Sequence, residues 1–168
     1  SELGLEKKQI RLSLYFRTQT LQKQIAEAIQ EELQNNLGIR VDLYQVEGKL
    51  FVEKLQKHQF QLALTFLSAQ YPDPLNLLDR FKYKHQLKNY SQYENKKLTH
   101  LLDLAKACQD LKKRIEFIKA AESVLLSDMP LIPLYHCNYT ALIQPYVKNA
   151  KIGPFGDLHF DQVCIDDK

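Results

Sequence analysis

The chain has 168 residues, 45% of them hydrophobic and 26% charged, so it can build one ordinary domain with a buried core and is not intrinsically disordered. All of its uninterrupted apolar runs are too short to span a membrane. The 23 basic and 20 acidic residues leave a net charge of +3, which is too balanced to predict a polyanion partner.

The first third of the chain alternates between the hydrophobic periods of strands and helices. The predicted elements are, in chain order, a strand at 10–16, a helix at 20–36 that Gly38 ends, a strand at 39–46, a short helix near 50–55 and a strand at 60–66. Strands that alternate with helices over short connections predict right-handed crossovers and a parallel core sheet. We therefore expect an α/β fold.

The middle of the chain is predicted to be helical. Two apolar stripes with helical spacing, at 98–108 and 111–125, predict two helices, and Asp110 stands where an N-cap would separate them. Two prolines follow the second stripe and forbid further helix, so we expect 131–135 to run extended.

The last segment, 140–168, has no sustained helical or strand period. Short strands are predicted around Leu142 and Val163. A turn is predicted between them at 153–156, where two glycines flank the region of Pro154.

The sequence lacks the motifs of the common enzyme classes. No glycine-rich phosphate cradle follows a predicted strand, and neither a G-x-S-x-G nor an H-E-x-x-H motif is present. Cys108, Cys137 and Cys164 have neither C-x-x-C nor zinc-ligand spacing. His136 and Cys137 are adjacent, but neighbours on an extended segment point to opposite faces and cannot form a nucleophile–base pair. We therefore expect a binding protein rather than an enzyme.

Two alternatives stay open. Asp157, His159 and Asp161 alternate and could share one face of a strand as metal ligands, which would suit a small metal-dependent α/β enzyme. The segment Arg80–Tyr90 interleaves bases with aromatic rings, a pattern typical of domains that bind single-stranded nucleic acid. Ordinary solvated surface explains both patterns, and we prefer that interpretation: no metal, no cofactor and no nucleic-acid partner.

The end of the third predicted strand is the best candidate for a ligand site. In open parallel sheets, ligands gather beyond the carboxyl ends of the strands. Ser68 and Ala69 are small enough for another molecule to approach the backbone, while Gln70 and Tyr71 offer polar groups beside an apolar ring. Asp73 precedes a proline, and we interpret it as the N-cap of a helix rather than as a ligand contact.

The segment 60–74 resembles the signature of the extracytoplasmic peptide-binding proteins of ABC transporters, the oligopeptide/dipeptide solute-binding family 5, in which a strand F-D-x-x precedes G-W-x-A-D-Y-x-D-P. Further on, 89–102 resembles the family's Y-x-N-x-x-x-D-x-L-L. The segment 114–135 resembles R-x-x-x-Y-x-x-A-E-x-x-L-x-x-D-x-P-x-I-P-L-Y. Upstream, 25–41 is similar to I-A-x-x-I-Q-x-x-L-x-x-I-G-I-x-V. These matches are collinear and span about residues 10–146.

This resemblance implies one lobe of a two-lobed clamp. The expected fold is a lobe of the type II periplasmic binding proteins, with a mixed or parallel sheet flanked by helices. Residues 1–134 would form the C-terminal lobe, and 135–168 would be the crossover and final segment that returns toward a missing N-terminal lobe of the same chain. Closure of such lobes around a hinge is a common gating device.

The resemblance also implies function and location. Such proteins capture a peptide or other small solute between their lobes, without catalysis, and deliver it to an ABC permease in the membrane. The implied location is periplasmic or otherwise extracytoplasmic, and attachment as a lipoprotein stays open. The implied ligand-binding residues are Phe66, Leu67, Ser68, Ala69, Gln70, Tyr71, Tyr135, His136 and Cys137.

Two of these positions depart from the family pattern. Gln70 stands where oligopeptide-binding members hold an aspartate that grips the amino terminus of the peptide, and Leu67 stands where they usually hold a tryptophan. Glutamine supplies no charge opposite to an ammonium group, and charge-assisted hydrogen bonds are about twice as strong as neutral ones. The expected ligand is therefore a blocked or modified peptide, or another solute such as a sugar or a nickel complex.

Overall fold

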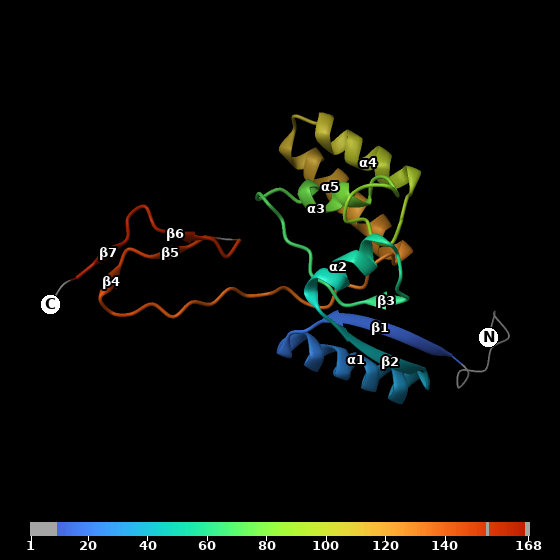
Figure 1. Cartoon of the computed structure of the whole chain (residues 1–168). Coiled ribbons are helices and arrows are strands. Elements are labelled where there is room, and N and C mark those ends of the chain that lie inside the picture. Colours follow the sequence, from blue (N-terminus) through green and yellow to red (C-terminus); the bar gives the residue numbers. More distant parts are fainter. Residues whose placement is uncertain (1–9, 154, 167–168) are drawn as a thin grey trace. The chain divides into compact units, whose positions relative to one another are not determined.

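The computed structural model describes residues 10–153 and 155–166 (Figure 1). The chain divides into two compact units, of which the first ends at Leu67 and the second begins at Ser68. In the described ranges, no helix is long and apolar enough to cross a membrane.

The first unit is a small parallel sheet with helices. Its sheet has the order β2-β1-β3, and β1 pairs in parallel with both neighbours, so that Leu14 lies between Leu43 and Leu62. The α/β prediction is confirmed. The elements are β1 (Arg11–Arg17), α1 (Thr20–Leu37), β2 (Arg40–Val46), α2 (Gly48–Gln56) and β3 (Leu62–Ala63).

The two helices of this unit cover opposite faces of the sheet (Figure 1). The crossover from β1 to β2 and the crossover from β2 to β3 lead in opposite directions, so right-handed connections must place α1 and α2 on different sides. Alternate residues of β1, Leu14 and Phe16, are buried together with Ala26 of α1. On the other face, Tyr15 stacks on Tyr44 at 4.9 Å between ring centroids.

Gly38 ends α1 as predicted. Its φ of 68° lies in the left-handed region, and its N–H donates to the carbonyl of Gln34 at 3.0 Å. The next N–H, of Ile39, donates to the carbonyl of Leu33 at 3.2 Å. These two bonds satisfy carbonyls that the end of a helix leaves without an intrahelical partner.

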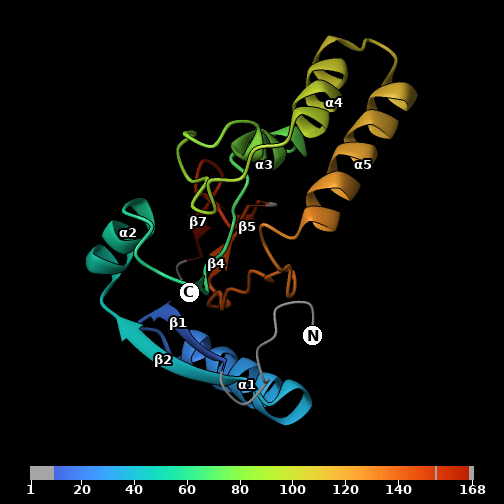
Figure 2. The same cartoon turned by 90° about the vertical axis from the view of Figure 1, so that its right-hand side faces the viewer.

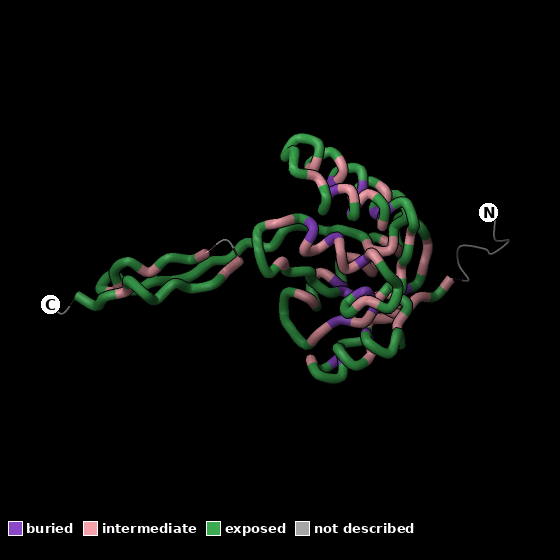
Figure 3. The backbone as a smooth tube through the Cα atoms, turned by 90° about the horizontal axis from the view of Figure 1, so that it is seen from above, coloured by how far each residue is buried: buried purple, intermediate pink, exposed green. Residues whose placement is uncertain are grey.

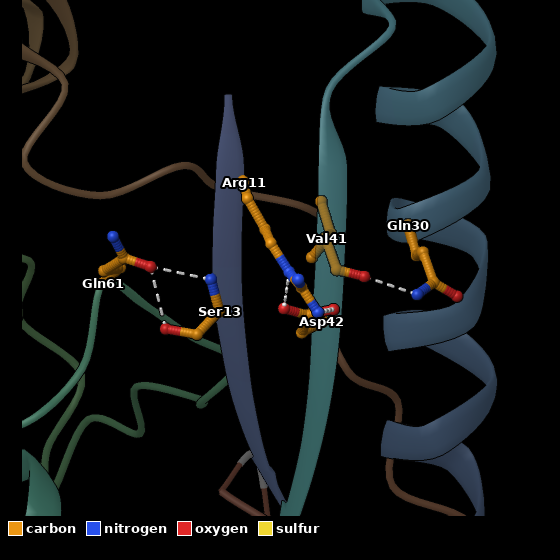
Figure 4. Close-up of polar contacts among 6 residues, drawn as sticks. All are labelled: Arg11, Ser13, Gln30, Val41, Asp42 and Gln61. Atoms are coloured by element: carbon orange, nitrogen blue, oxygen red, sulfur yellow. Dashed lines mark hydrogen bonds and ion pairs between the residues drawn. The ribbon is translucent and has the colours of Figure 1, made fainter. Parts of the chain in front are cut away.

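The third strand is much shorter than the predicted 60–66. Its pairing with β1 is limited to Leu62 and Ala63, followed by one further bond from the N–H of Leu64 to the carbonyl of Tyr15 at 2.8 Å. Before it, the side chain of Gln61 replaces a backbone acceptor: its Oε1 accepts from the N–H of Ser13 at 2.8 Å and from the Ser13 hydroxyl at 2.9 Å (Figure 4). The alternation of apolar residues therefore extends beyond the hydrogen-bonded strand.

The outer edge of the sheet, at β2, is partly covered by side chains (Figure 4). The amide nitrogen of Gln30 in α1 donates to the carbonyl of Val41 at 2.5 Å. Arg11 and Asp42 form an ion pair across the two strands at 2.5 Å. The bond from Gln30 satisfies an edge carbonyl that would otherwise be open to another strand, whereas the ion pair links the side chains of β1 and β2.

The second unit is built on a pair of helices, α4 (Lys96–Ala107) and α5 (Leu111–Asp128), which lie side by side (Figure 2). A short helix, α3 (Leu75–Leu78), and the 3-10 turn η2 (Asp79–Phe81) complete the core. The predicted N-cap is confirmed, because a carboxylate oxygen of Asp110 accepts the N–H groups of two residues in the first turn of α5. The buried side chains are Leu75, Leu78, Phe81, Leu98, Leu102, Ala105, Ile118, Ala121 and Leu125.

The end of the chain forms two small antiparallel ladders. β4 (Val147–Lys148) pairs with β7 (Cys164–Ile165), and β5 (Lys151–Ile152) pairs with β6 (Leu158–His159). The strand predicted near Val163 corresponds to β7. The strand predicted around Leu142 is wrong, because this residue is fully exposed and belongs to no strand.

The turn predicted at 153–156 is confirmed at its described positions, between β5 and β6. The N–H of Gly156 donates to the carbonyl of Gly153 at 3.0 Å, and the N–H of Gly153 donates to that of Asp157 at 2.7 Å. Gly156 has a φ of 81°, which favours glycine. The third residue of this prediction, Pro154, lies outside the described residues.

Candidate ligand-binding segments

The loop at Ser68–Tyr71 is held in place through its backbone. The N–H of Gln70 donates to the side-chain carbonyl of Asn76 in α3 at 2.9 Å. The guanidinium of Arg80 in η2 donates to the carbonyl of Ser68 at 2.6 Å. The carbonyl of Tyr71 accepts from the N–H of Asp73 at 2.8 Å.

Asp73 joins this loop to the helices. Its Oδ1 accepts from the N–H of Leu75 at 2.9 Å, so it has the capping role that we predicted, although α3 begins at Leu75 rather than at the proline. Its Oδ2 lies 2.5 Å from a guanidinium nitrogen of Arg114 in α5. Both side chains are largely buried, and both oxygens of the carboxylate are occupied.

The side chains of the predicted site are, in contrast, mostly exposed. Phe66 is 59% exposed and Tyr71 is 51% exposed. Gln70 is also exposed, and its side chain makes no hydrogen bond with the described residues. The loop therefore presents side chains that the folded unit does not use, as a ligand-binding segment would.

The second predicted segment, Tyr135–Cys137, is extended and exposed. Desolvation and a hydrogen bond with Cys137 raise the pKa of Tyr135. On an extended backbone, Tyr135 and Cys137 are expected on one side. His136, between them, is expected on the other side, in agreement with the argument against a catalytic His–Cys pair. Among the described residues, no hydrogen bond or ion pair joins this segment to Ser68–Tyr71.

The residues of the metal alternative come together only in part. His159 lies 2.8 Å from a carboxylate oxygen of Asp157, but Asp161 does not join them. In the described part of the chain, no three or more His, Cys, Asp or Glu side chains are close enough to hold a metal ion.

The basic and aromatic segment of the nucleic-acid alternative is partly used within the fold. Phe81 is buried in the core, and the guanidinium of Arg80 is bound to the loop described above. Lys82 pairs with Asp103 of α4, and this contact raises the pKa of the lysine. Tyr83 stacks on His85. An electrostatic groove for a nucleic-acid backbone needs cations that are not already paired.

Sequence reasoning missed the residues that hold the loop, namely Asn76, Arg80 and Arg114. Asn76 is polar within an apolar helix, L-N-L-L, which is a weak signal. Arg114 is 41 positions from Asp73, so no local pattern could have joined them.

The family follows from comparison with known proteins. Residues 1–89, more than half of the chain, match the model of the bacterial extracellular solute-binding proteins, family 5, middle region. The chain belongs to this family. The resemblance found in the sequence is thereby confirmed.

Two relatives of this chain come from Bacillus subtilis. The oligopeptide-binding protein OppA is 29% identical over 95% of the chain, and the dipeptide-binding protein DppE is 32% identical over 86% of it. The chain covers 30% of OppA and 26% of DppE. It thus spans less than a third of the length of these relatives.

Solved structures confirm the type II binding-protein fold. The pheromone receptor PrgZ superposes with a TM-score of 0.81 at 25% identity, over 99% of the chain and 32% of the receptor. The murein tripeptide-binding protein MppA of Escherichia coli superposes with a TM-score of 0.76 at 27% identity, over 83% of the chain and 27% of MppA.

Proposed function

We propose that this chain is part of the solute-binding component of an ABC importer, that peptides are its ligand class, and that it carries out no catalysis. The observation that carries the proposal is the family match, together with relatives named for oligopeptide and dipeptide binding that align with 86–95% of the chain. The protein would capture its ligand in the cleft between two lobes and deliver it to a permease.

Within that protein, 1–134 would be the C-terminal lobe and 135–168 the crossover and final segment. The exposed apolar side chains of the final segment support this role, since a surface of this kind normally lies against other protein. The partner would be the N-terminal lobe of the same protein. The location of the whole protein would be extracytoplasmic, like that of its periplasmic relative MppA, with or without a lipid anchor.

The ligand would contact Phe66–Tyr71 and Tyr135–Cys137. Exposure of these side chains and the backbone anchoring of the first segment support this assignment. The Gln70 side chain would meet the amino terminus of the peptide. The amide oxygen accepts a hydrogen bond but carries no negative charge to attract the ammonium group. A peptide with a free amino terminus would therefore bind little more tightly than one with a blocked amino terminus.

The test is Gln70→Asp in the full-length native protein. A library of tri- to pentapeptides identifies the tightest ligand, which is then titrated calorimetrically in its free and N-acetylated forms. We expect the aspartate to tighten binding of the free form by about tenfold, because the new bond is charge-assisted, and to leave the acetylated form unimproved. Gln70→Glu is the matched control, since its carboxylate carries the same charge one methylene further from the backbone than the carboxylate of Gln70→Asp. An unchanged ratio of the two affinities in Gln70→Asp would contradict this assignment.

A further inference from the structure

The backbone of Ser68–Tyr71 is fixed by groups that lie outside the loop. Asn76 accepts the Gln70 N–H, and Arg80 donates to the Ser68 carbonyl. Neither bond involves the side chain at position 70 or 71. A substitution at those two positions therefore leaves both bonds available.

The two anchoring residues are themselves held by the hydrophobic core. Asn76 follows Leu75, which is 6% exposed, and Arg80 precedes Phe81, which is 5% exposed. These two neighbours pack in the same cluster as α4 and α5. The loop is thus attached to residues that adjoin the packed hydrophobic core.

A third anchor comes from α5. Arg114 pairs with Asp73 at 2.5 Å, just beyond the loop, and both side chains are largely withdrawn from water. Three different elements, α3, η2 and α5, therefore converge on a stretch of six residues. Rigid support of this kind is what places binding groups accurately.

We infer that Asn76 and Arg80 are positioning residues, which hold the ligand-binding loop in one conformation whatever side chain stands at position 70. This inference rests on the proposed function. It separates two tasks: Asn76 and Arg80 set how strongly all ligands bind, because a preorganised loop loses less entropy on binding, while Gln70 sets which ligands bind.

The experiment compares Asn76→Ala with Asn76→Asp in the full-length native protein, using the free and N-acetylated forms of the library-selected peptide. Asn76→Ala removes the acceptor, and we expect both affinities to fall about fivefold while their ratio stays constant. Asn76→Asp keeps an acceptor oxygen and should restore the affinity for the N-acetylated form, which has no ammonium group for the added charge to attract. Hydrogen exchange of the Gln70 amide should speed up in Asn76→Ala and not in Asn76→Asp, whereas Gln70→Asp should leave that exchange slow.

The matched control is Lys106→Ala, which breaks an ion pair with Asp79 of η2, at 2.7 Å, without touching the loop. It should change neither affinity. If Asn76→Ala does not fold, Arg80→Gln tests the other anchor with the same measurements. Unchanged affinities in Asn76→Ala, or a changed ratio between the two peptides in that variant, would overturn the inference. Absence of peptide binding in the unsubstituted protein would instead refute the proposed function itself.

Discussion

Asp128, the last residue of α5, is bound by two residues that precede α4. The hydroxyl of Tyr93 and the side-chain nitrogen of Asn95 each donate to its Oδ2 at 2.6 Å. Both bonds hold the pKa of Asp128 below its usual value. Asn95 also caps α4, because its Oδ1 accepts from the N–H of Lys97 at 2.8 Å. The spacing Tyr-x-Asn thus joins the beginning of one helix to the end of the next.

The same loop has one fully buried polar side chain, that of Asn89. Its nitrogen donates to the carbonyls of Tyr83 and Tyr93, at 2.9 and 2.7 Å. Its oxygen accepts from the hydroxyl of Ser91 at 3.1 Å. A buried amide with both ends satisfied holds a chain without regular secondary structure in a defined path.

Tyr93 gives a prediction about alkaline pH. Burial and the hydrogen bond to Asp128 raise the pKa of Tyr93 to about 12. Because the folded-state pKa lies above the ordinary value of about 10, the neutral phenol stabilises the fold below that pH, and this stabilisation is lost as pH rises toward about 12. We expect the thermal unfolding midpoint to fall more steeply over this range in the native protein than in Tyr93→Phe.

The control for this experiment is Tyr146→Phe, which removes an exposed tyrosine of the final segment. Its midpoint should follow that of the unsubstituted protein. Parallel pH profiles for Tyr93→Phe and the unsubstituted protein would contradict the account of Tyr93.

At the scale of elements, the cap between α4 and α5 gives a prediction about stability. Oδ1 of Asp110 accepts from the N–H groups of Lys112 and Lys113, at 2.9 and 3.2 Å. Asp110→Ala leaves both donors without this acceptor and should lower the free energy of unfolding by about 1 kcal/mol. Asp110→Ser should recover most of it. Urea denaturation followed by helical circular dichroism measures both, and a loss no larger than that of Gln109→Ala, an exposed neighbour, would refute the cap.

The elements that could be predicted from sequence are those in which apolar residues recur with the period of a helix or a strand. α1, β2 and the α4–α5 pair each have a regular apolar face, and each was found close to its predicted limits. β3 was predicted too long because its apolar alternation continues beyond its backbone pairing, which the side chain of Gln61 replaces at the beginning and which ends after the N–H of Leu64. The apolar residues near Leu142 resemble a strand in sequence but are exposed in the structure.

In the candidate site, the exposed side chains and the residues that support them differ in how far sequence predicts them. The exposed side chains stay a prediction from sequence, based on loops beyond parallel strands and on a family signature. Their support could not be predicted, since the pair Asp73–Arg114 joins residues 41 positions apart and depends on how α5 packs. Contacts of this kind become visible only when the tertiary structure is known.

At the scale of the whole molecule, the final segment has too few buried side chains to be stable by itself. Figure 3 shows it as almost continuously exposed. Ladders of two residues each provide little cooperative structure. Apart from Tyr135, which we assign to the ligand, the strongly exposed apolar residues from 132 onward are Ile132, Leu134, Tyr139, Leu142, Tyr146, Phe160 and Ile165. We expect the upstream lobe of the full-length protein to cover them.

The most direct test of the account is whether the full-length native protein binds peptides. The tightest ligand from a tri- to pentapeptide library is titrated calorimetrically at low and at high salt. The titrations measure the affinity and its dependence on salt. We predict saturable binding of one peptide per protein, with an affinity that changes little with salt, because a cleft contacts its ligand mainly through backbone bonds and apolar groups. Absence of peptide binding, or binding of single-stranded nucleic acid that weakens steeply as salt rises, would contradict it.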